Sequence, residues 1–185
     1  MRKLVVVLLL MLAAVNAHAL EVAGVHLEPA VIVNNHPLRL NGYGIRKKFF
    51  VKVYIGSLYT AKMVARADEA LNEPGDKLIR MNFLHSKVDK GKITEAFSEG
   101  FAANSPQLAG SAEVKKFLAF FTSDFSKGDT VDLSLGSDGR VVAVHNGKVL
   151  GTITSKRLAK GILAIYLGEK PADEALKKGM LGRES

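Results

Sequence analysis

The 185-residue chain contains no cysteine. No disulfide bond can therefore form, even in an oxidising compartment, and the fold must be stabilised by packing alone. One domain of this length can bury a core large enough for that purpose.

The sequence also lacks the spacings of the common metal and catalytic motifs. Its histidines stand singly, without the His-x₃-His or Glu-x-x-His spacing of a metal site. No Gly-x-Ser-x-Gly motif marks a serine nucleophile. The Gly42-Tyr43-Gly44 segment lacks the third glycine and the following helix of a dinucleotide fingerprint. We therefore expect no metal and no cofactor.

Basic residues outnumber acidic ones, and the formal net charge is +8. The lysines are scattered rather than clustered, and few aromatic residues lie between them, so no nucleic-acid site is expected. A solvated basic surface is the simplest interpretation. Affinity for an acidic ligand or an anionic lipid remains the alternative.

The N-terminus has the pattern of a secretory signal peptide. Arg2 and Lys3 precede an apolar run from Leu4 to Val15, and a small-x-small site ends at Ala19. The run is shorter than the roughly 20 residues that span a bilayer, which disfavours a membrane anchor. We expect cleavage after Ala19, a single domain over residues 20–185 and a periplasmic or secreted location.

Hydrophobic alternation predicts an antiparallel sheet. The expected strands are 22–27, 30–33, 38–41, 49–59, 77–84, 131–135, 140–145 and 149–153. Asn146-Gly147 is a strong signal for a two-residue hairpin turn between the last two strands.

Apolar residues at helical spacing predict helices as well. The expected helices are 62–71, one from Lys92 to about Asn104, one around 114–121, one from Thr154 or Ser155 to Leu167, and a short one from Pro171. Strands and helices segregated in this way indicate the α+β class, with helices gathered on one side of the sheet.

The most informative segment is Leu38 to Thr60. Gly42 and Gly44 are expected to let the backbone bend or adopt positive φ, and a basic run from Arg46 to Lys48 precedes an expected strand. A cation at the end of an apolar strand suits an amphipathic anion, because the guanidinium can hold the charged head while the sheet face contacts the apolar body. Lys52 is either a second anion contact or a charge that deters strand pairing.

This segment also carries a resemblance to a known family. Gly-x-Gly-x-Arg followed by Lys-Phe-Phe-x-Lys-Val-Tyr, together with the run from Gly161 to Pro171, resembles the bacterial, exported branch of the chalcone isomerase family. The resemblance extends over nearly all of the chain after Ala19. It implies an open-faced β-sandwich with a helical layer over a ligand cleft.

The resemblance also implies a site. Arg46 matches the arginine that holds the anionic end of the substrate in the enzymes and a carboxylate in fatty-acid-binding relatives. The polar positions of the enzymes fall at Tyr54, Ile93, Gly100 and Ile165. Apolar residues at three of these positions would remove partners for an oxyanion, a loss of about 10²–10³ in rate for each donor.

We therefore expect a non-catalytic protein that binds a small amphipathic anion, a fatty acid or an aromatic acid, through Arg46. One alternative is an isomerase or intramolecular lyase in which Arg46 and Tyr54 form the polar pair. A second is an interaction module for an envelope partner. Phenylalanines such as Phe97 and Phe117 are expected in the core rather than in a cavity wall.

Overall fold

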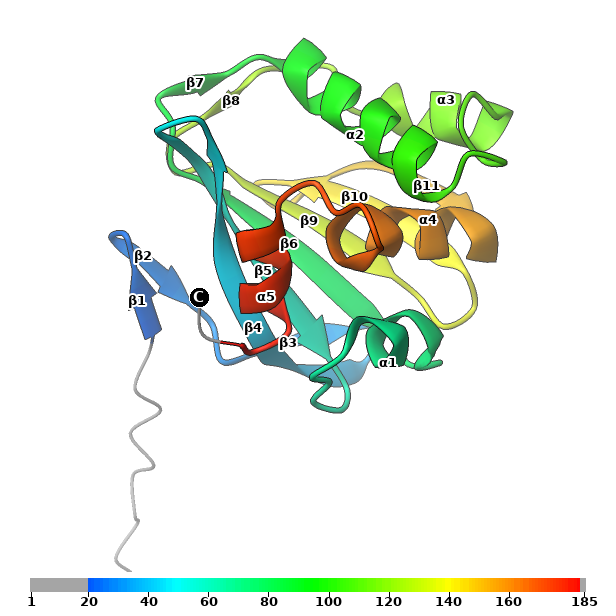
Figure 1. The fold of residues 1–185 in the computed structure, drawn as a ribbon, viewed down its shortest axis with the longest axis horizontal. Helices are drawn as coiled ribbons and strands as arrows, with labels where there is room; N and C mark the ends of the chain where they lie inside the picture. The colour runs from blue at the N-terminus through cyan, green and yellow to red at the C-terminus, as the bar shows by residue number, and fades with distance from the viewer. Residues whose placement is uncertain (1–19, 184–185) are drawn as a thin grey trace, which may run out of the picture.

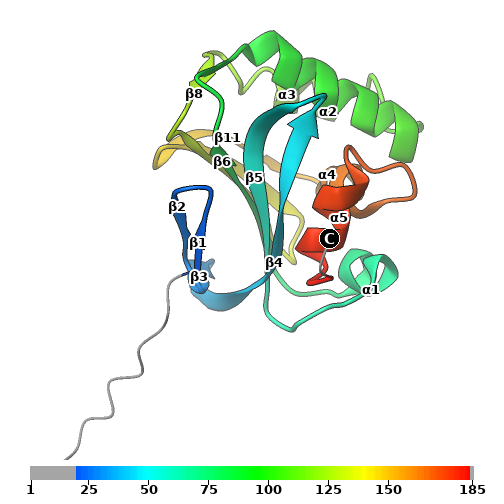
Figure 2. The same cartoon turned by 60° about the vertical axis from the view of Figure 1, so that its left-hand side comes forward.

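The computed structural model describes residues 20–183. A curled antiparallel sheet has helices over one face, and the hairpin of β1 (Leu20–Val22) and β2 (Val25–Leu27) lies on its other side (Figures 1 and 2). This architecture confirms the predicted α+β class. The predicted signal peptide, residues 1–19, lies outside the described residues.

The main sheet has seven strands in the order β11-β10-β9-β6-β5-β4-β3. Its strands are β3 (Ala30–Val33), β4 (His36–Lys48), β5 (Val51–Thr60), β6 (Lys77–Phe83), β9 (Thr130–Leu135), β10 (Arg140–His145) and β11 (Lys148–Thr154). A second small hairpin pairs β7 (Lys87–Val88) with β8 (Phe125–Ser126).

The helices are α1 (Ala67–Asn72), α2 (Lys90–Asn104), α3 (Ala112–Leu118), α4 (Lys156–Leu167) and α5 (Glu174–Met180). The larger of two hydrophobic clusters fills the space between them and the sheet, and a smaller one consists of Val33, Leu38, Tyr59 and Leu78. No helix among residues 20–183 is both long and apolar enough to cross a membrane.

Local signals located α4 and the last hairpin correctly. The Ser155 hydroxyl accepts a hydrogen bond from the Leu158 N–H, and Gly168 follows the last turn of α4, as expected of helix caps. Asn146 and Gly147 both have positive φ and form the two-residue turn between β10 and β11.

Several other predicted boundaries of strands and helices were wrong. The expected strand 22–27 is interrupted by a tight turn at Ala23 and Gly24, both with positive φ. The expected helix 62–71 contracts to the short α1. The last helix begins at Glu174 rather than Pro171, because the Asp173 carboxylate caps it by accepting the Leu176 N–H at 2.9 Å.

The hairpin of β4 and β5 also differs from the prediction. The basic run from Arg46 to Lys48 lies within β4, and Phe49 and Phe50 form the turn instead of opening a strand. Alternation of apolar residues cannot show where a strand reverses, and this turn lacks the glycine, asparagine or aspartate that normally marks one.

The prediction allowed Gly42 and Gly44 to adopt positive φ, but neither residue does so. Their role is to admit α5. A Cβ on Gly42 would lie 2.2 Å from the Gly179 carbonyl oxygen, and one on Gly44 would lie 2.7 Å from the Leu176 Cα. Helix α5 therefore rests directly on the backbone of β4, which no larger residue would permit.

Asn41, which is 3% exposed, ties the same region together. Its side-chain amide donates to the Val64 and Met180 carbonyl oxygens at 2.9 and 2.8 Å, and its side-chain oxygen accepts the Val64 N–H at 2.7 Å. The end of α5 and the segment after β5 are thereby joined to β4.

Replacing Gly44 with alanine should lower the free energy of unfolding by about 1–3 kcal/mol, because α5 must move away from β4 to admit a methyl group. Urea denaturation would measure the change. Gly75→Ala is the matched control, since a Cβ there would meet only the end of the Glu73 side chain. Equal effects of the two substitutions would contradict the direct packing of α5 on the backbone of β4.

Candidate ligand-binding site

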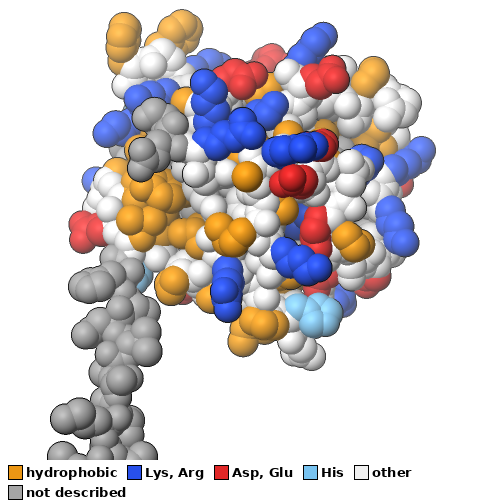
Figure 3. Space-filling view, turned by 60° about the horizontal axis from the view of Figure 1, so that its bottom comes forward, with side chains coloured by type: hydrophobic (Ala, Val, Ile, Leu, Met, Phe, Trp, Pro, Cys, Tyr) orange, Lys and Arg blue, Asp and Glu red, His pale blue; other side chains and the backbone are white. Residues whose placement is uncertain are grey.

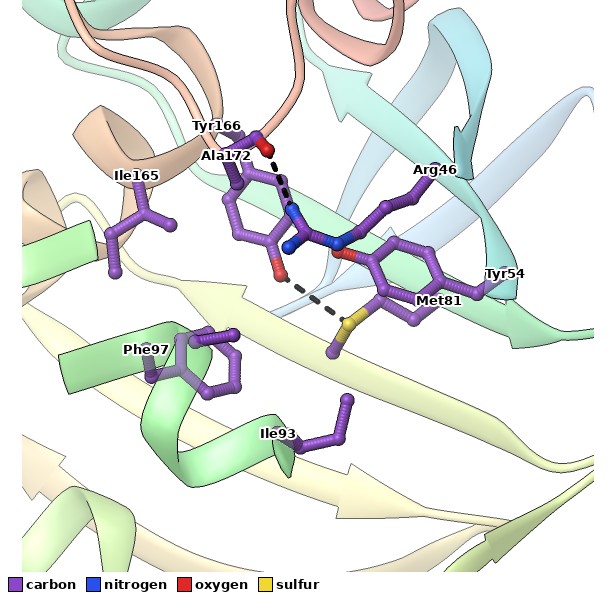
Figure 4. A pocket seen from close by; sticks show the side chains of 9 residues that line it. Arg46, Tyr54, Met81, Ile93, Phe97, Ile165, Tyr166 and Ala172 are labelled. Atoms are coloured by element: carbon purple, nitrogen blue, oxygen red, sulfur yellow. Dashed lines mark hydrogen bonds between the residues drawn. The ribbon is translucent and has the colours of Figure 1, made fainter. Parts of the chain in front are cut away.

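The candidate site contains Arg46 and Tyr54, which lie directly opposite each other in the β4–β5 pair. Residues in this relation project to the same face of a sheet. Here that face lies under the helices, and both side chains line one pocket (Figure 4).

The rest of the lining comes from elements that are far apart in the sequence. Strand β6 contributes Met81, helix α2 contributes Ile93, Ala96 and Phe97, helix α4 contributes Ile165 and Tyr166, and the segment before α5 contributes Ala172. Helix α2 is positioned by its cap, where the Asp89 carboxylate accepts the Gly91 N–H at 2.7 Å. The lining is therefore apolar except for one guanidinium, two phenols and a carbonyl.

The Arg46 guanidinium is held by the backbone rather than by an acid. Its Nη1 donates to the Ala172 carbonyl oxygen at 2.9 Å. No ion pair among residues 20–183 involves Arg46, although the side chain is half-buried. Since a guanidinium has five N–H donors, Arg46 retains donors and an unneutralised charge for an anion.

The two phenols are almost completely buried, with Tyr54 4% and Tyr166 2% exposed. Burial raises the pKa of Tyr54, and the neighbouring Arg46 charge partly opposes that shift. Burial also raises the pKa of Tyr166 well above its ordinary value. Both hydroxyls are therefore neutral donors at physiological pH, and that of Tyr166 points to the Met81 sulfur at 3.3 Å.

The cavity between these side chains measures about 30 Å³. This volume holds water molecules but no organic ligand, for which pockets are typically about 300 Å³ or more. The pocket in this structure is therefore too small for such a ligand, although its polar groups face the cavity.

All the predicted site residues except Gly100 line this pocket. Gly100 stands behind it: a Cβ there would lie 2.7 Å from the Ile165 Cγ2, so the glycine lets α2 approach α4. Lys52 is exposed and does not line the pocket.

Sequence reasoning did not single out Met81, Tyr166 or Ala172. The helical pattern could not select Tyr166, because every residue from Gly161 to Leu167 is buried and no face is distinguished. Phe97 is a core residue, as predicted, since it stacks on Phe121 with ring centroids 5.4 Å apart, but it also lines the pocket.

Metal chemistry finds no support in the described part of the chain. No group of three or more histidine, aspartate or glutamate side chains there could hold an ion. The pocket lining itself contains neither a carboxylate nor an imidazole.

A family model described as chalcone isomerase-like matches residues 19–182. The chain belongs to this family, and the resemblance predicted from its motifs is confirmed.

Two comparisons show which members it is similar to. Fatty-acid-binding protein 1 of Arabidopsis thaliana is 23% identical over 175 residues, a match covering 77% of this chain and 62% of that protein's length. The crystal structure of an Arabidopsis thaliana fatty-acid binding protein superposes with a TM-score of 0.70 at 20% identity, covering 86% of this chain and 92% of the other. The structural match establishes the shared fold.

The buried tyrosines predict a loss of stability in alkali. The pKa values of Tyr54 and Tyr166 are raised in the folded state, and burial raises that of Tyr59 to about 12. The unfolded chain loses these protons near pH 10, so the free energy of unfolding should fall as the pH rises above about 10. Urea denaturation across that range measures the slope, which Tyr166→Phe should reduce. A slope unchanged by that substitution would contradict the assignment.

Proposed function

We propose that this protein binds a small amphipathic carboxylate, of the fatty-acid type, without transforming it. The main support is the Arg46 guanidinium, which has no acidic partner among the described residues and faces a pocket that is apolar apart from two phenols and a carbonyl. Two neutral phenols beside it can donate further hydrogen bonds to a carboxylate. The similarity to Arabidopsis fatty-acid-binding protein 1 supports the same ligand class.

Ligand entry requires the pocket to open. The acyl chain would displace α2, which contributes Ile93, Ala96 and Phe97 to the wall. Phe97 packs edge-on against Phe117 and stacks on Phe121, so its ring can shift while remaining in aromatic contact. Binding in this way couples ligand uptake to a change in the helical layer.

The pKa shifts argue against acid–base catalysis. A general base works best with a pKa near the operating pH, whereas the Tyr54 and Tyr166 values are displaced upward. The second candidate remains an isomerase or intramolecular lyase, favoured by the grouping of Arg46 with two phenols. Turnover of a chalcone, abolished by Arg46→Ala, would support that candidate.

We also propose that the protein is exported and acts in the periplasm or outside the cell, beginning at Leu20. The signal-peptide pattern of residues 1–19 supports this. The intact mass of the protein purified from an expressing bacterium tests the proposal. A mass that includes residues 1–19 would overturn it.

The ligand proposal is tested by mass spectrometry of small molecules extracted from the purified protein, and by titration with a fatty-acid series of increasing chain length. Arg46→Ala should weaken binding of the carboxylate by about 1.5–3 kcal/mol, the value of a hydrogen bond to a charged group. Arg39→Ala, at an exposed position of the same strand, is the matched control and should bind as the wild type does.

A ligand that binds equally well to wild type and Arg46→Ala would rule out this site. Binding limited to the shortest acids would show that the pocket does not open for an acyl chain.

Tyr166→Phe separates the contribution of the phenol from that of the charge. Loss of one neutral donor should weaken carboxylate binding by about 0.5–1.5 kcal/mol, less than loss of Arg46. The corresponding fatty alcohol serves as the control ligand: it lacks the charge, so Arg46→Ala should affect it much less. The reverse order of effects would contradict carboxylate recognition by Arg46.

A further inference from the structure

The turn of the β4–β5 hairpin exposes two aromatic side chains that the fold does not use. Phe49 is 88% and Phe50 101% exposed. Every other phenylalanine of the chain is buried or half-buried. The next residue, Val51, is 42% exposed, so the tip is continuously apolar.

The backbone of this turn is strained as well. Lys48 and Val51 are the last pair of the ladder, which leaves Phe49 and Phe50 as a two-residue loop. Phe49 has φ 56°, a conformation that bulky residues rarely adopt and that glycine, asparagine or aspartate normally provides in such loops. Local strain combined with exposed aromatic surface indicates a function beyond folding.

Cations surround the tip. Residues 38–60 contain five basic residues and no acidic one. Lys47, Lys48 and Lys52 are exposed, and no ion pair among the described residues involves them. The Asp173 carboxylate does lie near the base of the tip, where it accepts the Lys47 backbone N–H at 3.2 Å.

We propose that this tip inserts into the surface of a bilayer that contains anionic lipid. Aromatic side chains favour the membrane interface, and each lysine near an anionic surface adds about 1 kcal/mol of attraction. The tip is the turn at the upper left edge of Figure 1. Figure 3 shows hydrophobic side chains projecting at that corner above Lys and Arg side chains.

The shape of the tip favours a bilayer over a protein partner. A stable protein interface buries about 1,200–2,000 Å², mostly from surfaces that match in shape. A two-residue convex turn contributes little to such an area, whereas a fluid lipid surface adapts to it.

The location of the tip also connects it to the pocket. Arg46 lies in β4, three positions before Phe49 of the turn. At the rise of a strand, this separation along the chain is roughly 10 Å. Docking would bring the pocket close to the acyl chains of the membrane. The docking itself does not depend on ligand binding and is tested separately.

The chain contains no tryptophan, so one introduced at the tip is a sole fluorescent reporter. In Phe50→Trp, vesicles of phosphatidylcholine with phosphatidylglycerol should shift the emission to the blue, and brominated lipid should quench it. Ile32→Trp is the matched control, because Ile32 is 77% exposed on β3 and pairs with Pro37, at the end of β4 opposite the tip. No shift in Phe50→Trp, or equal shifts in both, would overturn the proposal.

A second variant separates docking from folding. Phe49→Gly with Phe50→Asn places glycine at the position of positive φ in this two-residue turn, so the protein should be at least as stable to urea as the wild type. Its binding to the same vesicles in a flotation assay should fall about tenfold or more, because two apolar side chains no longer enter the interface. Vesicle binding equal to the wild type would overturn the proposal.

Charge reversal completes the test. Lys47→Glu with Lys48→Glu should abolish the preference for phosphatidylglycerol over pure phosphatidylcholine, and Lys115→Glu with Lys116→Glu on the exposed side of α3 should not. If the Phe50→Trp emission responds to an added protein but never to vesicles, the tip is a protein-binding site and the membrane proposal fails. Fatty-acid titration of the Phe49→Gly, Phe50→Asn variant in solution reports on the pocket independently.

Discussion

The direct packing of α5 on the backbone of β4 is the contact on which the site depends. Gly42 and Gly44 leave room for that helix, and the amide of Asn41 holds its last turn. The segment just before α5 is thereby placed against β4, where the Ala172 carbonyl accepts a hydrogen bond from Arg46. Two glycines and one hydrogen-bonding amide in a short segment of β4 thus place the carbonyl that orients the charged group at the pocket.

That charged group explains the character of the pocket. A carboxylate partner would neutralise the guanidinium, whereas a carbonyl oxygen orients it and leaves most of its charge available. The buried phenols remain protonated and supply donors without a competing negative charge. Under the proposed function, such a site would favour an anionic head over a neutral one. Its closed apolar walls suit a ligand that can separate α2 from the sheet.

The β4–β5 hairpin contains three features: the glycines on which α5 packs, the Arg46–Tyr54 pair that lines the pocket, and the exposed apolar tip. Chain connectivity therefore places the pocket and the tip a short distance apart, because both lie on the β4–β5 pair. This arrangement suits the proposed uptake of an amphipathic molecule from a lipid surface, and so does the absence of acidic residues from residues 38–60.

The sequence by itself determined the α+β class, the caps of α4 and the Asn146-Gly147 turn, because these follow from local periodicity and side-chain hydrogen bonds. Motif resemblance brought Arg46 and Tyr54 forward as site residues. Tertiary structure decided what local patterns do not encode. The Phe49-Phe50 turn violates turn preferences, Tyr166 lies in the half of α4 that is buried on every side, and Gly42 makes room for a helix more than 130 residues later in the chain. Each of these features depends on which distant segments come into contact, and hydrophobic alternation does not predict such contacts.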